Sequence, residues 1–501
     1  MQRIIVSAML ACAVAFAPTG FASDKIVILH TNDTHSQLMP DDKGRGGIAR
    51  RKVLVDSVRA VNPATILVDA GDAVQGTAYF TLFKGNTESD AMNALDYDFQ
   101  IIGNHEFDNG LEEFARYWKR VKATPLATNY DFTGTPAEGI FRPWAVKEIA
   151  GHRIGFMGIG LDPHGMVADT NFKGMRYINA IEAANAVAWV LRNIERTDLV
   201  VALTHIGYND PERVSDVELA RSSRDIDIII GGHSHTAINP ADSLSPASVV
   251  ENSVGKPVLI TQTGKSGRFL GEITIDSIGA LPSYRLIPVD SRLDSRIDSS
   301  LTAVIEPYRA DVDSVMAIRI GTVKSDMDQN EMTNFMADFV ASEARRLTGK
   351  KVDLAIVNKG GVRGTFSRGA LTVGDVMQVF PFDNRIVVLE IKGSDLLDNL
   401  MIMTRTGGNG LSREAEVVFS GRDKVDSARI NDKEIDPERT YTLATIDYLA
   451  NGGDYMVPLT RGKRVATSDD IIYTDMIEVF SHGAMKGRTL KADSTVRMHE
   501  P

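Results

Sequence analysis

The segment that decides the fold is residues 26–35, which read IVILHTNDTH. Four apolar residues run directly into Asp33 and His35, a carboxylate and an imidazole two residues apart. An unbroken, mostly β-branched run of this length is typical of a strand buried on both faces. Side chains two residues apart lie on the same side of an extended chain, so both can bind one metal ion. The segment therefore predicts a buried strand that ends in metal ligands.

The same pattern recurs four times in the first half of the chain. Apolar runs end in polar clusters at 65–72 (TILVDAGD), 99–106 (FQIIGNHE), 199–205 (LVVALTH) and 226–235 (IDIIIGGHSH). If these strands lie side by side, their ends converge at one rim of a sheet. Carboxylate, amide and imidazole donors in such number suit two divalent metal ions. The candidate ligands are Asp33, His35, Asp72, Asn104, His205, His233 and His235.

Length and charge narrow the class of protein. The chain has 501 residues, of which 43% are hydrophobic and 24% charged, an ordinary globular composition for two domains. The formal net charge is −11, and no long run of Lys and Arg occurs. This balance argues against a nucleic-acid polymer as partner. A small anionic substrate fits if metal ions and a few arginines reverse the local field.

The N-terminus has the pattern of an export signal. Arg3 precedes an apolar stretch over residues 4–17, and residues 20–22 form a small-residue cleavage site. We expect residues 1–22 to be removed, because the stretch is shorter than the ~20 residues of a membrane-spanning helix. Cys12, the only cysteine, leaves a lipid anchor open as an alternative. The pattern predicts a periplasmic, secreted or cell-surface protein without a transmembrane span.

The rest of the chain divides by composition. Residues 23–292 alternate apolar runs with helical patterns, as at 48–61 and 181–194, and become β-rich after residue 249. Residues 293–316 are rich in Asp and Ser and are predicted to be a linker, although a surface helix fits the composition nearly as well. Residues 317–501 form a second domain with a strong amphipathic helix at 334–347.

The ordered set of motifs resembles that of binuclear metallophosphoesterases. The segments at 31–35 (TNDTH) and 104–108 (NHEFD) narrow the resemblance to the 5′-nucleotidase group, which includes UDP-sugar hydrolases and 2′,3′-cyclic-nucleotide phosphodiesterases. The resemblance implies a four-layer α/β/β/α sandwich for residues 23–292. It implies a second α/β domain, residues 317–501, that binds the substrate.

The resemblance also assigns roles to the metal ligands. Asp33, His35, Asp72 and His235 would surround one ion, and Asp72, Asn104, His205 and His233 the other. The mixed nitrogen and oxygen donors suit Zn, Mn or Co and leave the metal open.

A catalytic dyad follows from the same resemblance. His105 and Asp108 would act together, with the carboxylate holding the imidazole as a cation beside the leaving oxygen. The alternative role for Asp108 is that of a helix N-cap, since residues 109–112 have a helical pattern.

The second domain would hold the nucleoside. By resemblance, Phe382 and Tyr448 sandwich the base, Asn384 bonds its edge, Asp454 accepts from the ribose and Arg363 grips the phosphate. Asn358, at the end of the strand predicted over 352–357, is a further candidate substrate residue. The chain departs from the family at residues 324–334 (KSDMDQNEMTN), where acids occupy positions that often carry arginine. Nucleoside monophosphates are therefore expected to bind better than ATP or UDP-sugars.

The leading hypothesis is an exported, metal-dependent 5′-nucleotidase that releases inorganic phosphate. It is expected to be a monomer or weak dimer whose two domains close on each other during catalysis. Hydrolysis of 2′,3′-cyclic nucleotides, of UDP-sugars or of another small anion, such as a thioester of sulfur oxidation, remains open on the same machinery. From another class, a non-catalytic nucleotide-binding surface protein would not need His105 and Asp108.

Overall fold

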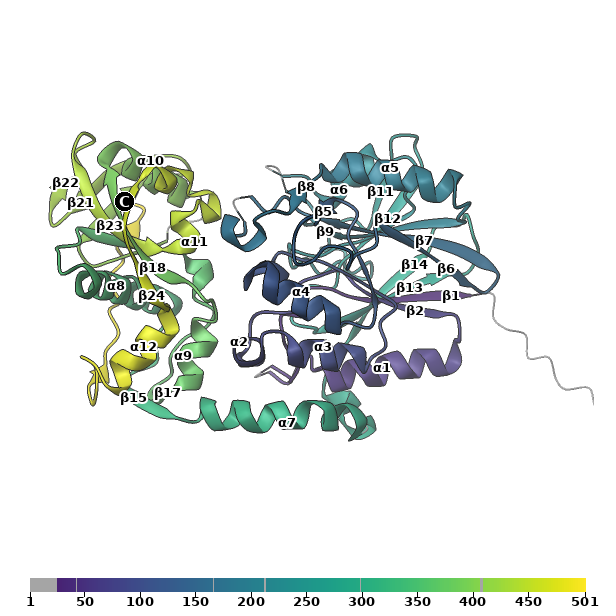
Figure 1. The fold of residues 1–501 in the computed structure, drawn as a ribbon, viewed down its shortest axis with the longest axis horizontal. Coiled ribbons are helices and arrows are strands. Elements are labelled where there is room, and N and C mark those ends of the chain that lie inside the picture. The colour runs from purple at the N-terminus through teal and green to yellow at the C-terminus, as the bar shows by residue number, and fades with distance from the viewer. Residues whose placement is uncertain (1–24, 42, 165, 211–212, 298, 406–408) are drawn as a thin grey trace, which may run out of the picture.

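The computed structural model describes residues 25–41, 43–164, 166–210, 213–297, 299–405 and 409–501. The predicted signal peptide, residues 1–22, and Cys12 lie outside the described residues. The chain forms two lobes, and helix α7 (Ser299–Met316) runs along one side of the molecule between them (Figure 1).

The first lobe contains two six-stranded sheets. One has the order β14-β13-β1-β2-β3-β4 and the other the order β11-β12-β10-β9-β7-β6. The strands of the first are β1 (Ile26–Thr31), β2 (Thr65–Asp69), β3 (Phe99–Ile101), β4 (Thr124–Leu126), β13 (Phe269–Ile275) and β14 (Ser283–Pro288). Those of the second are β6 (Trp144–Ile149), β7 (His152–Gly160), β9 (Leu199–His205), β10 (Ile228–Ile230), β11 (Val249–Glu251) and β12 (Pro257–Thr261). A two-stranded sheet pairs β5 (Tyr130–Asp131) with β8 (Arg176–Tyr177).

A simple side-by-side arrangement would place all five apolar runs in one sheet. The structure instead divides them between two sheets. β1, β2 and β3 lie in the first sheet and β9 and β10 in the second. The sheets pack face to face through one apolar core, to which Ile28, Val68, Val201 and Ile230 contribute with no exposed surface. Because each strand is buried on both faces, either sheet satisfies the continuous apolar pattern. The ligand-bearing ends thus meet at adjacent rims of two sheets.

Helices cover the outer faces of both sheets. α1 (Ile48–Val61), α3 (Asn86–Asn93) and α7 pack on the outer face of the first sheet. α5 (Ala180–Asn193) and α6 (Asp216–Ser222) pack on that of the second. These layers confirm the predicted α/β/β/α sandwich. Two more helices, α2 (Ala78–Phe83) and α4 (Gly110–Arg120), follow the loops after β2 and β3.

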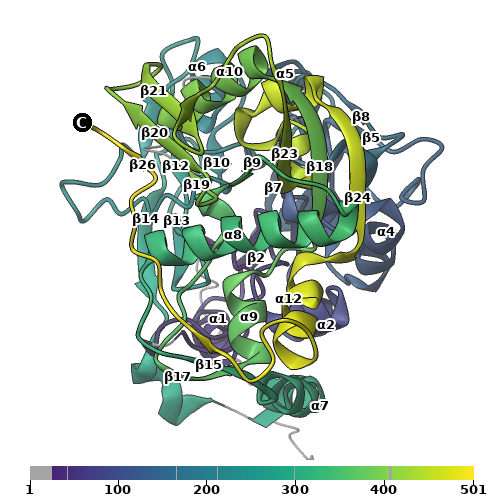
Figure 2. The same cartoon turned by 90° about the vertical axis from the view of Figure 1, so that its left-hand side faces the viewer.

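The second lobe is built on a five-stranded sheet of order β19-β16-β23-β18-β24. Its strands are β16 (Leu354–Val357), β18 (Arg385–Lys392), β19 (Gly410–Leu411), β23 (Thr440–Ile446) and β24 (Lys463–Ile471). Helix α8 (Gln329–Thr348) lies across all five strands (Figure 2). The other helices are α9 (Val373–Val379), α10 (Gly393–Thr404), α11 (Asp447–Ala450) and α12 (Ile472–Ser481).

Two smaller sheets complete this lobe. One has the order β17-β15-β25, with β15 (Arg319–Val323), β17 (Gly369–Thr372) and β25 (Thr489–Leu490). The other has the order β22-β21-β20-β26, with β20 (Ala415–Phe419), β21 (Val425–Ile430), β22 (Lys433–Glu434) and β26 (Met498–His499). The lobe is thus the second α/β domain that the sequence predicts.

The predicted linker is folded. Residues 291–296 form a 3-10 helix, and residues 299–316 form α7, which contacts α1, α2 and α3 of the first lobe and α9 of the second. Its buried side chains Leu301, Ile305 and Val312 belong to the core of the first lobe. The connection between the lobes is therefore a packed helix, anchored mainly on the first.

Two further observations bear on where function lies. Among the described residues, no helix combines the length and apolar character needed to cross a bilayer.

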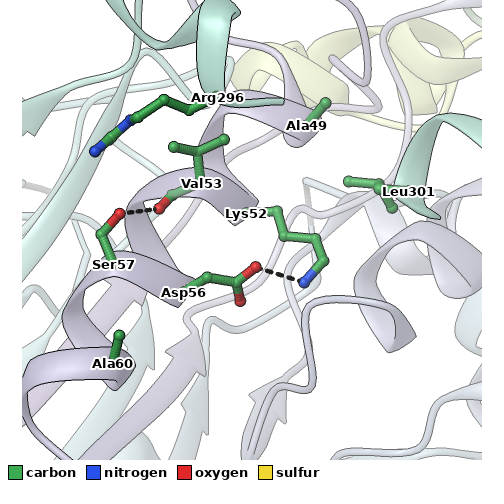
Figure 3. A pocket seen from close by; sticks show the side chains of 8 residues that line it. All are labelled: Ala49, Lys52, Val53, Asp56, Ser57, Ala60, Arg296 and Leu301. Atoms are coloured by element: carbon green, nitrogen blue, oxygen red, sulfur yellow. Dashed lines mark hydrogen bonds and ion pairs between the residues drawn. The ribbon is translucent and has the colours of Figure 1, made fainter. Parts of the chain in front are cut away.

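A hollow of about 300 Å³ lies beside α1, where Lys52 pairs with Asp56 at 2.7 Å and the Ser57 hydroxyl donates to the Val53 carbonyl (Figure 3). Of the polar side chains that line this hollow, Lys52, Asp56 and Ser57 thus bond within α1, and only the Arg296 guanidinium is drawn without such a bond.

Candidate active site

The candidate metal ligands stand on tight turns directly after their strands. Asp33, His35, Asp72, His233 and His235 all have left-handed backbone, with φ between 47° and 73°. Side chains other than glycine rarely adopt this region, although Asp, Asn and His do so more readily than most. Strained residues of this kind cluster at functional sites, where the surrounding structure holds them. The turns thus aim the five side chains inward.

Glycines make room for this convergence. A Cβ atom at Gly103 would lie 2.2 Å from Oδ1 of Asp72. One at Gly232 would lie 2.7 Å from Nδ1 of His205. Both contacts are too short for any side chain, so only glycine lets the backbone at residue 103 approach Asp72 and that at residue 232 approach His205.

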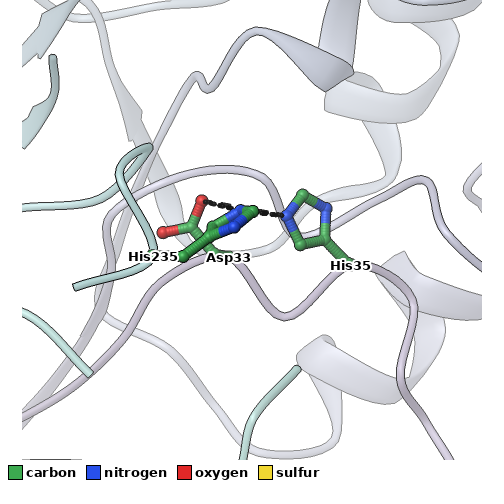
Figure 4. A group of neighbouring side chains, drawn as sticks. All are labelled: Asp33, His35 and His235. Atoms are coloured by element: carbon green, nitrogen blue, oxygen red, sulfur yellow. Dashed lines mark hydrogen bonds and ion pairs between the residues drawn. The ribbon is translucent and has the colours of Figure 1, made fainter. Parts of the chain in front are cut away.

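The first donor cluster joins Asp33, His35 and His235 (Figure 4). Nε2 of His35 lies 2.9 Å from Nε2 of His235, and Nε2 of His235 lies 3.5 Å from Oδ1 of Asp33. Three donors from the loops after β1 and β10 thus surround one point. Asn32 steadies the carboxylate, because its Nδ2 donates to Oδ2 of Asp33 at 2.6 Å.

The second donor cluster joins Asp33, Asp72 and His205. Nε2 of His205 lies 3.2 Å from Oδ2 of Asp72 and 3.9 Å from Oδ1 of Asp33. Beside it, Nδ1 of His233 lies 2.9 Å from Oδ1 of Asn104. The structure therefore brings all seven sequence-predicted ligands into one neighbourhood, with the carboxylates between the imidazoles.

The donor set fits a pair of divalent cations. Nε2 of His205 is fully buried and has no hydrogen-bond partner, while its Nδ1 faces the Ala70 carbonyl at 2.7 Å. Burial acts to lower the pKa of His205, but the carboxylates of Asp72 and Asp33 raise it to about 10, so the imidazole is a cation in the metal-free protein. A metal ion would take the place of the Nε2 proton, while the carbonyl keeps the other proton on Nδ1, the usual arrangement for metal-binding histidines. Burial lowers the pKa of His233 to about 3 and that of His235 to about 4, so both imidazoles are neutral at pH 7. Neutral imidazoles are the form that binds metals.

Asp72 is the charged centre of the cluster. Burial acts to raise the pKa of its carboxyl, but the nearby imidazoles of His205 and His105 hold that pKa well below its ordinary value. The group is therefore an anion at neutral pH. Its Oδ2 faces His205 and its Oδ1 accepts the backbone N–H of His105 at 2.9 Å.

His105 and Asp108 form the predicted pair. Nδ1 of His105 lies 2.8 Å from Oδ2 of Asp108. Burial acts to lower the pKa of His105, but the carboxylates of Asp108 and Asp72 raise it to about 9. The imidazole is thus a cation in the metal-free protein, and Nδ1–H donates to Asp108. Asp108 does not cap α4, because Asn109 occupies that position.

The second domain faces this cluster across one cavity of about 680 Å³. The loops after β2, β3 and β10 of the first domain line one side. All six predicted substrate residues line the cavity from the second domain, namely Asn358, Arg363, Phe382, Asn384, Tyr448 and Asp454. The cavity therefore joins both groups of predicted site residues.

Direct contacts show how close the two groups lie. The ring of Phe382 has its centroid 6.1 Å from that of His105, and the Arg363 guanidinium lies 5.0 Å from the Phe382 ring. Asp454 links two other members of the wall, because it accepts from the Tyr448 hydroxyl at 2.8 Å and from Nδ2 of Asn358 at 2.7 Å. Both of its carboxylate oxygens thus have partners within the chain.

Sequence reasoning missed one organising residue. Glu106 is buried and accepts the backbone N–H groups of Asp72, Ala73 and Gly103, at 3.2, 2.9 and 2.7 Å. It thereby ties the turn after β2 to the turn after β3. Its position inside the Asn-His-Glu segment is the signal that the sequence offers for it.

Family models match both domains. One described as calcineurin-like phosphoesterase matches residues 26–237, and one described as the 5′-nucleotidase C-terminal domain matches residues 312–460. The fold, the donor set and these matches place the chain in the metallophosphoesterases that carry a 5′-nucleotidase C-terminal domain. It is a phosphate-ester hydrolase, and divalent metal ions belong to that family's site.

Individual relatives agree with this membership. Protein UshA of Yersinia enterocolitica is 28% identical and covers 89% of this chain and 90% of its own. A 5′-nucleotidase of Vibrio vulnificus is 27% identical, with 92% of both chains covered. The crystal structure of a 5′-nucleotidase precursor from Thermus thermophilus superposes with a TM-score of 0.80 at 26% identity, over 95% of this chain and 99% of the other.

Proposed function

We propose that the protein is a metal-dependent nucleotide phosphohydrolase that converts nucleoside monophosphates to nucleoside and inorganic phosphate. The observation that carries the proposal is the single cavity with the donor clusters on one side and an aromatic, polar wall on the other. The 6.1 Å between the His105 and Phe382 rings leaves the reacting phosphate and the nucleoside in adjacent positions.

The donor clusters would hold two divalent ions. Asp33, His35, Asp72 and His235 would bind one, and Asp72, Asn104, His205 and His233 the other. When bound, such ions polarise the phosphate and activate a water. Zn, Mn and Co all suit these ligands.

His105 acts on the leaving group in this proposal. Its Nδ1–H is engaged by Asp108, so its Nε2–H is free to donate. A cationic imidazole stabilises the negative charge that develops on the leaving alkoxide and transfers its proton to that oxygen. Asp108 holds the ring in position and favours the charged form.

The second domain selects the nucleoside. Phe382 and Tyr448 offer ring faces, and stacking on an aromatic ring contributes about 1–3 kcal/mol per base. Asn384 would bond the base edge, and Asp454, together with Asn358, the ribose hydroxyls. Arg363 would grip a phosphate oxygen through its planar fork of donors.

The acids near the start of α8 favour monophosphates over ATP and UDP-sugars. Asp328 caps α8 by accepting from the backbone N–H of Glu331 at 2.8 Å, and Asp326 accepts from the backbone N–H of Arg368 at 2.7 Å. Gln329 donates to the Val362 carbonyl, so this helix start lies beside the loop of Arg363. Carboxylates there add no attraction for further phosphates.

The test is a substrate panel with metal control. Chelator-treated protein, reconstituted with Zn, Mn or Co, is assayed for phosphate release from AMP, ATP and UDP-glucose, and for turnover of 2′,3′-cyclic AMP. We expect AMP to give the highest kcat/KM and the chelated protein to be inactive. Absence of phosphate release from every nucleotide by the metal-loaded protein would refute the proposal.

Two variants separate the alternatives. A His105→Ala protein that binds nucleotides while the wild type hydrolyses none would identify a binding protein. Activity confined to cyclic or sugar nucleotides would replace the monophosphate proposal by one of the related reactions. A Phe382→Ala protein that loses nucleotides but keeps another anion as substrate would point away from nucleotides.

Export and domain closure complete the proposal. We propose that residues 1–22 direct the chain to the periplasm or the cell exterior, which N-terminal sequencing of the protein from cells would test. We also propose that the domains open to admit substrate. A cysteine pair that locks them apart would then abolish turnover, and survival of turnover would exclude the motion.

A further inference from the structure

An ion pair joins the two domains beside the cavity, which Asp383 lines. Nζ of Lys84 lies 2.6 Å from Oδ2 of Asp383, and both side chains are 30% exposed. Lys84 belongs to the first domain and Asp383 to the second. Neither residue was singled out from the sequence, because no local pattern relates positions 299 residues apart.

Asp383 stands in the middle of the proposed nucleoside-binding loop. Phe382 precedes it and Asn384 follows it, between the end of α9 and the start of β18. Its other oxygen, Oδ1, accepts from the Tyr473 hydroxyl on α12 at 3.0 Å. The carboxylate is therefore held from its own domain through one oxygen and from the metal-binding domain through the other.

Lys84 is tied to the metal-binding turns through α2. It ends this helix in left-handed conformation, with its backbone N–H bonded to the Phe80 carbonyl at 2.7 Å. The helix follows the turn that carries Asp72, and Phe80 itself lines the cavity. Leu82, two residues before Lys84, packs against the cores of both domains. Figure 1 shows α2 on the side of the first lobe that faces the second.

We propose that Lys84 is a positioning residue for the nucleoside. Through its ion pair with Asp383, it fixes the position of the loop of Phe382 and Asn384 relative to His105. This contact exists only while the two domains are together. Substrate recognition by the second domain thus depends on a cation supplied by the first. The inference rests on the proposed nucleotidase function and deepens it.

The contact should affect recognition more than chemistry. A partly exposed ion pair contributes modestly, because water screens it. Its loss leaves the donor clusters and the His105–Asp108 pair intact but lets the loop shift. A small ester without a nucleoside, such as p-nitrophenyl phosphate, offers no base edge to Asn384 and therefore depends less on that loop. The ratio of the two activities therefore isolates the role of Lys84.

The experiment compares Lys84→Met with the wild type on AMP and on p-nitrophenyl phosphate. We expect the ratio of kcat/KM for AMP to that for p-nitrophenyl phosphate to fall about fivefold, through KM for AMP, which corresponds to about 1 kcal/mol. Lys84→Arg should restore most of the ratio, because it keeps the charge. Asp383→Asn should lower the ratio by a similar factor, and the double variant should add little further.

The matched control is Lys52→Met. Lys52 also pairs with a carboxylate at 2.7 Å, that of Asp56, but on α1 beside the other hollow. It changes the net charge by the same amount and should leave the ratio unchanged. This comparison removes any general effect of charge on a nucleotide substrate.

The outcomes separate the two proposals. A wild-type ratio in Lys84→Met, an equal loss on both substrates, or strictly additive effects of the two substitutions would overturn the positioning role alone. A wild type that hydrolyses p-nitrophenyl phosphate but no nucleotide would overturn the proposed function, and the role of Lys84 with it.

Discussion

The proposed metal ligands of the first domain and the proposed nucleoside wall of the second differ in how they are held. Asp33 and His205 have no exposed surface, and Asp72 is 2% exposed. Asp33 and Asp72 stand on left-handed turns, and Glu106 fixes the turn of Asp72 by accepting its backbone N–H. His205 ends strand β9, and its Nδ1 faces the Ala70 carbonyl. In the wall, Phe382, Asn384 and Tyr448 are only half-buried, and Arg363 is exposed.

This difference separates reaction from recognition. The backbone conformation of the turns directs their side chains toward one another. Such fixed positions are expected where a reaction requires its groups to be placed precisely. The wall instead uses side chains that bond one another, as Asp454 bonds Tyr448 and Asn358. Such groups can exchange partners when a ligand enters. Substitutions on the two sides should therefore fail in different ways.

The largest effect should come from Asp72→Asn. The carboxylate stands between the imidazoles of both clusters, so its replacement removes the charge that both ions would share. We expect kcat to fall by more than about 100-fold, since even indirect partners of metal ligands are worth 10–100-fold. Metal analysis of the purified protein should show fewer ions bound per chain. Full metal content with full activity would contradict the assignment.

His105→Ala should be nearly as damaging but in a different way. Loss of a general acid lowers kcat by about 10²–10⁴-fold. Because His105 is not among the proposed ligands, the metal content should stay at the wild-type value. A parallel loss of metal would show that His105, which lies with His35 and Asp72 in a third donor group, is itself a ligand.

The substitution Asp108→Asn should lower the pH above which activity is lost. Burial opposes the charged form of His105, and Asp108 is the main group that raises its pKa to about 9. A raised pKa keeps the imidazole cationic below that value and lets it lose the proton as the pH rises through it. Without the carboxylate this loss occurs at lower pH. The basic limb of the kcat profile should therefore shift downward, and an unshifted limb would contradict the role of Asp108.

The smallest effect should come from the wall side, at Asp328. This residue and Glu331 form a reciprocal cap at the start of α8. Asp328→Ala should lower the stability by about 1 kcal/mol, as a lower melting temperature, whereas Asp328→Asn should keep the cap and the stability. Neither should change kcat on AMP. An equal loss of stability in both variants would mean that the charge, not the cap, matters.

The fold of the first domain was largely predictable, because its strands are buried on both faces. The helix expected over residues 48–61 has these same bounds in the structure. The assignment of strands to sheets was not predictable, since it depends on distant pairings such as Ile28 with Ile273. In the second domain, α8 begins at Gln329 rather than at the predicted residue 334, because Asp328 caps it.

The site was predictable where its signals are local. A polar residue after an apolar run is visible in the sequence, and the structure brings those residues together. Contacts between the domains, such as Lys84 with Asp383, depend on how two folded units sit against each other. Glu106 was visible but uninterpreted, because accepting three backbone N–H groups requires two turns to be adjacent first.

The left-handed turns have a consequence for the evolution and engineering of this protein. Glycine adopts the left-handed conformation of these positions without strain, but it has no side chain that could bind a metal. Each proposed ligand on these turns therefore costs backbone strain. Such strain is of the order of 1 kcal/mol or more per residue. Replacing His233 by glycine would relieve this backbone strain, but it would also remove the imidazole that faces Asn104 and with it a proposed metal ligand. Selection for thermal stability alone would therefore act against the residues on these turns. Stabilising substitutions should be sought elsewhere in the chain.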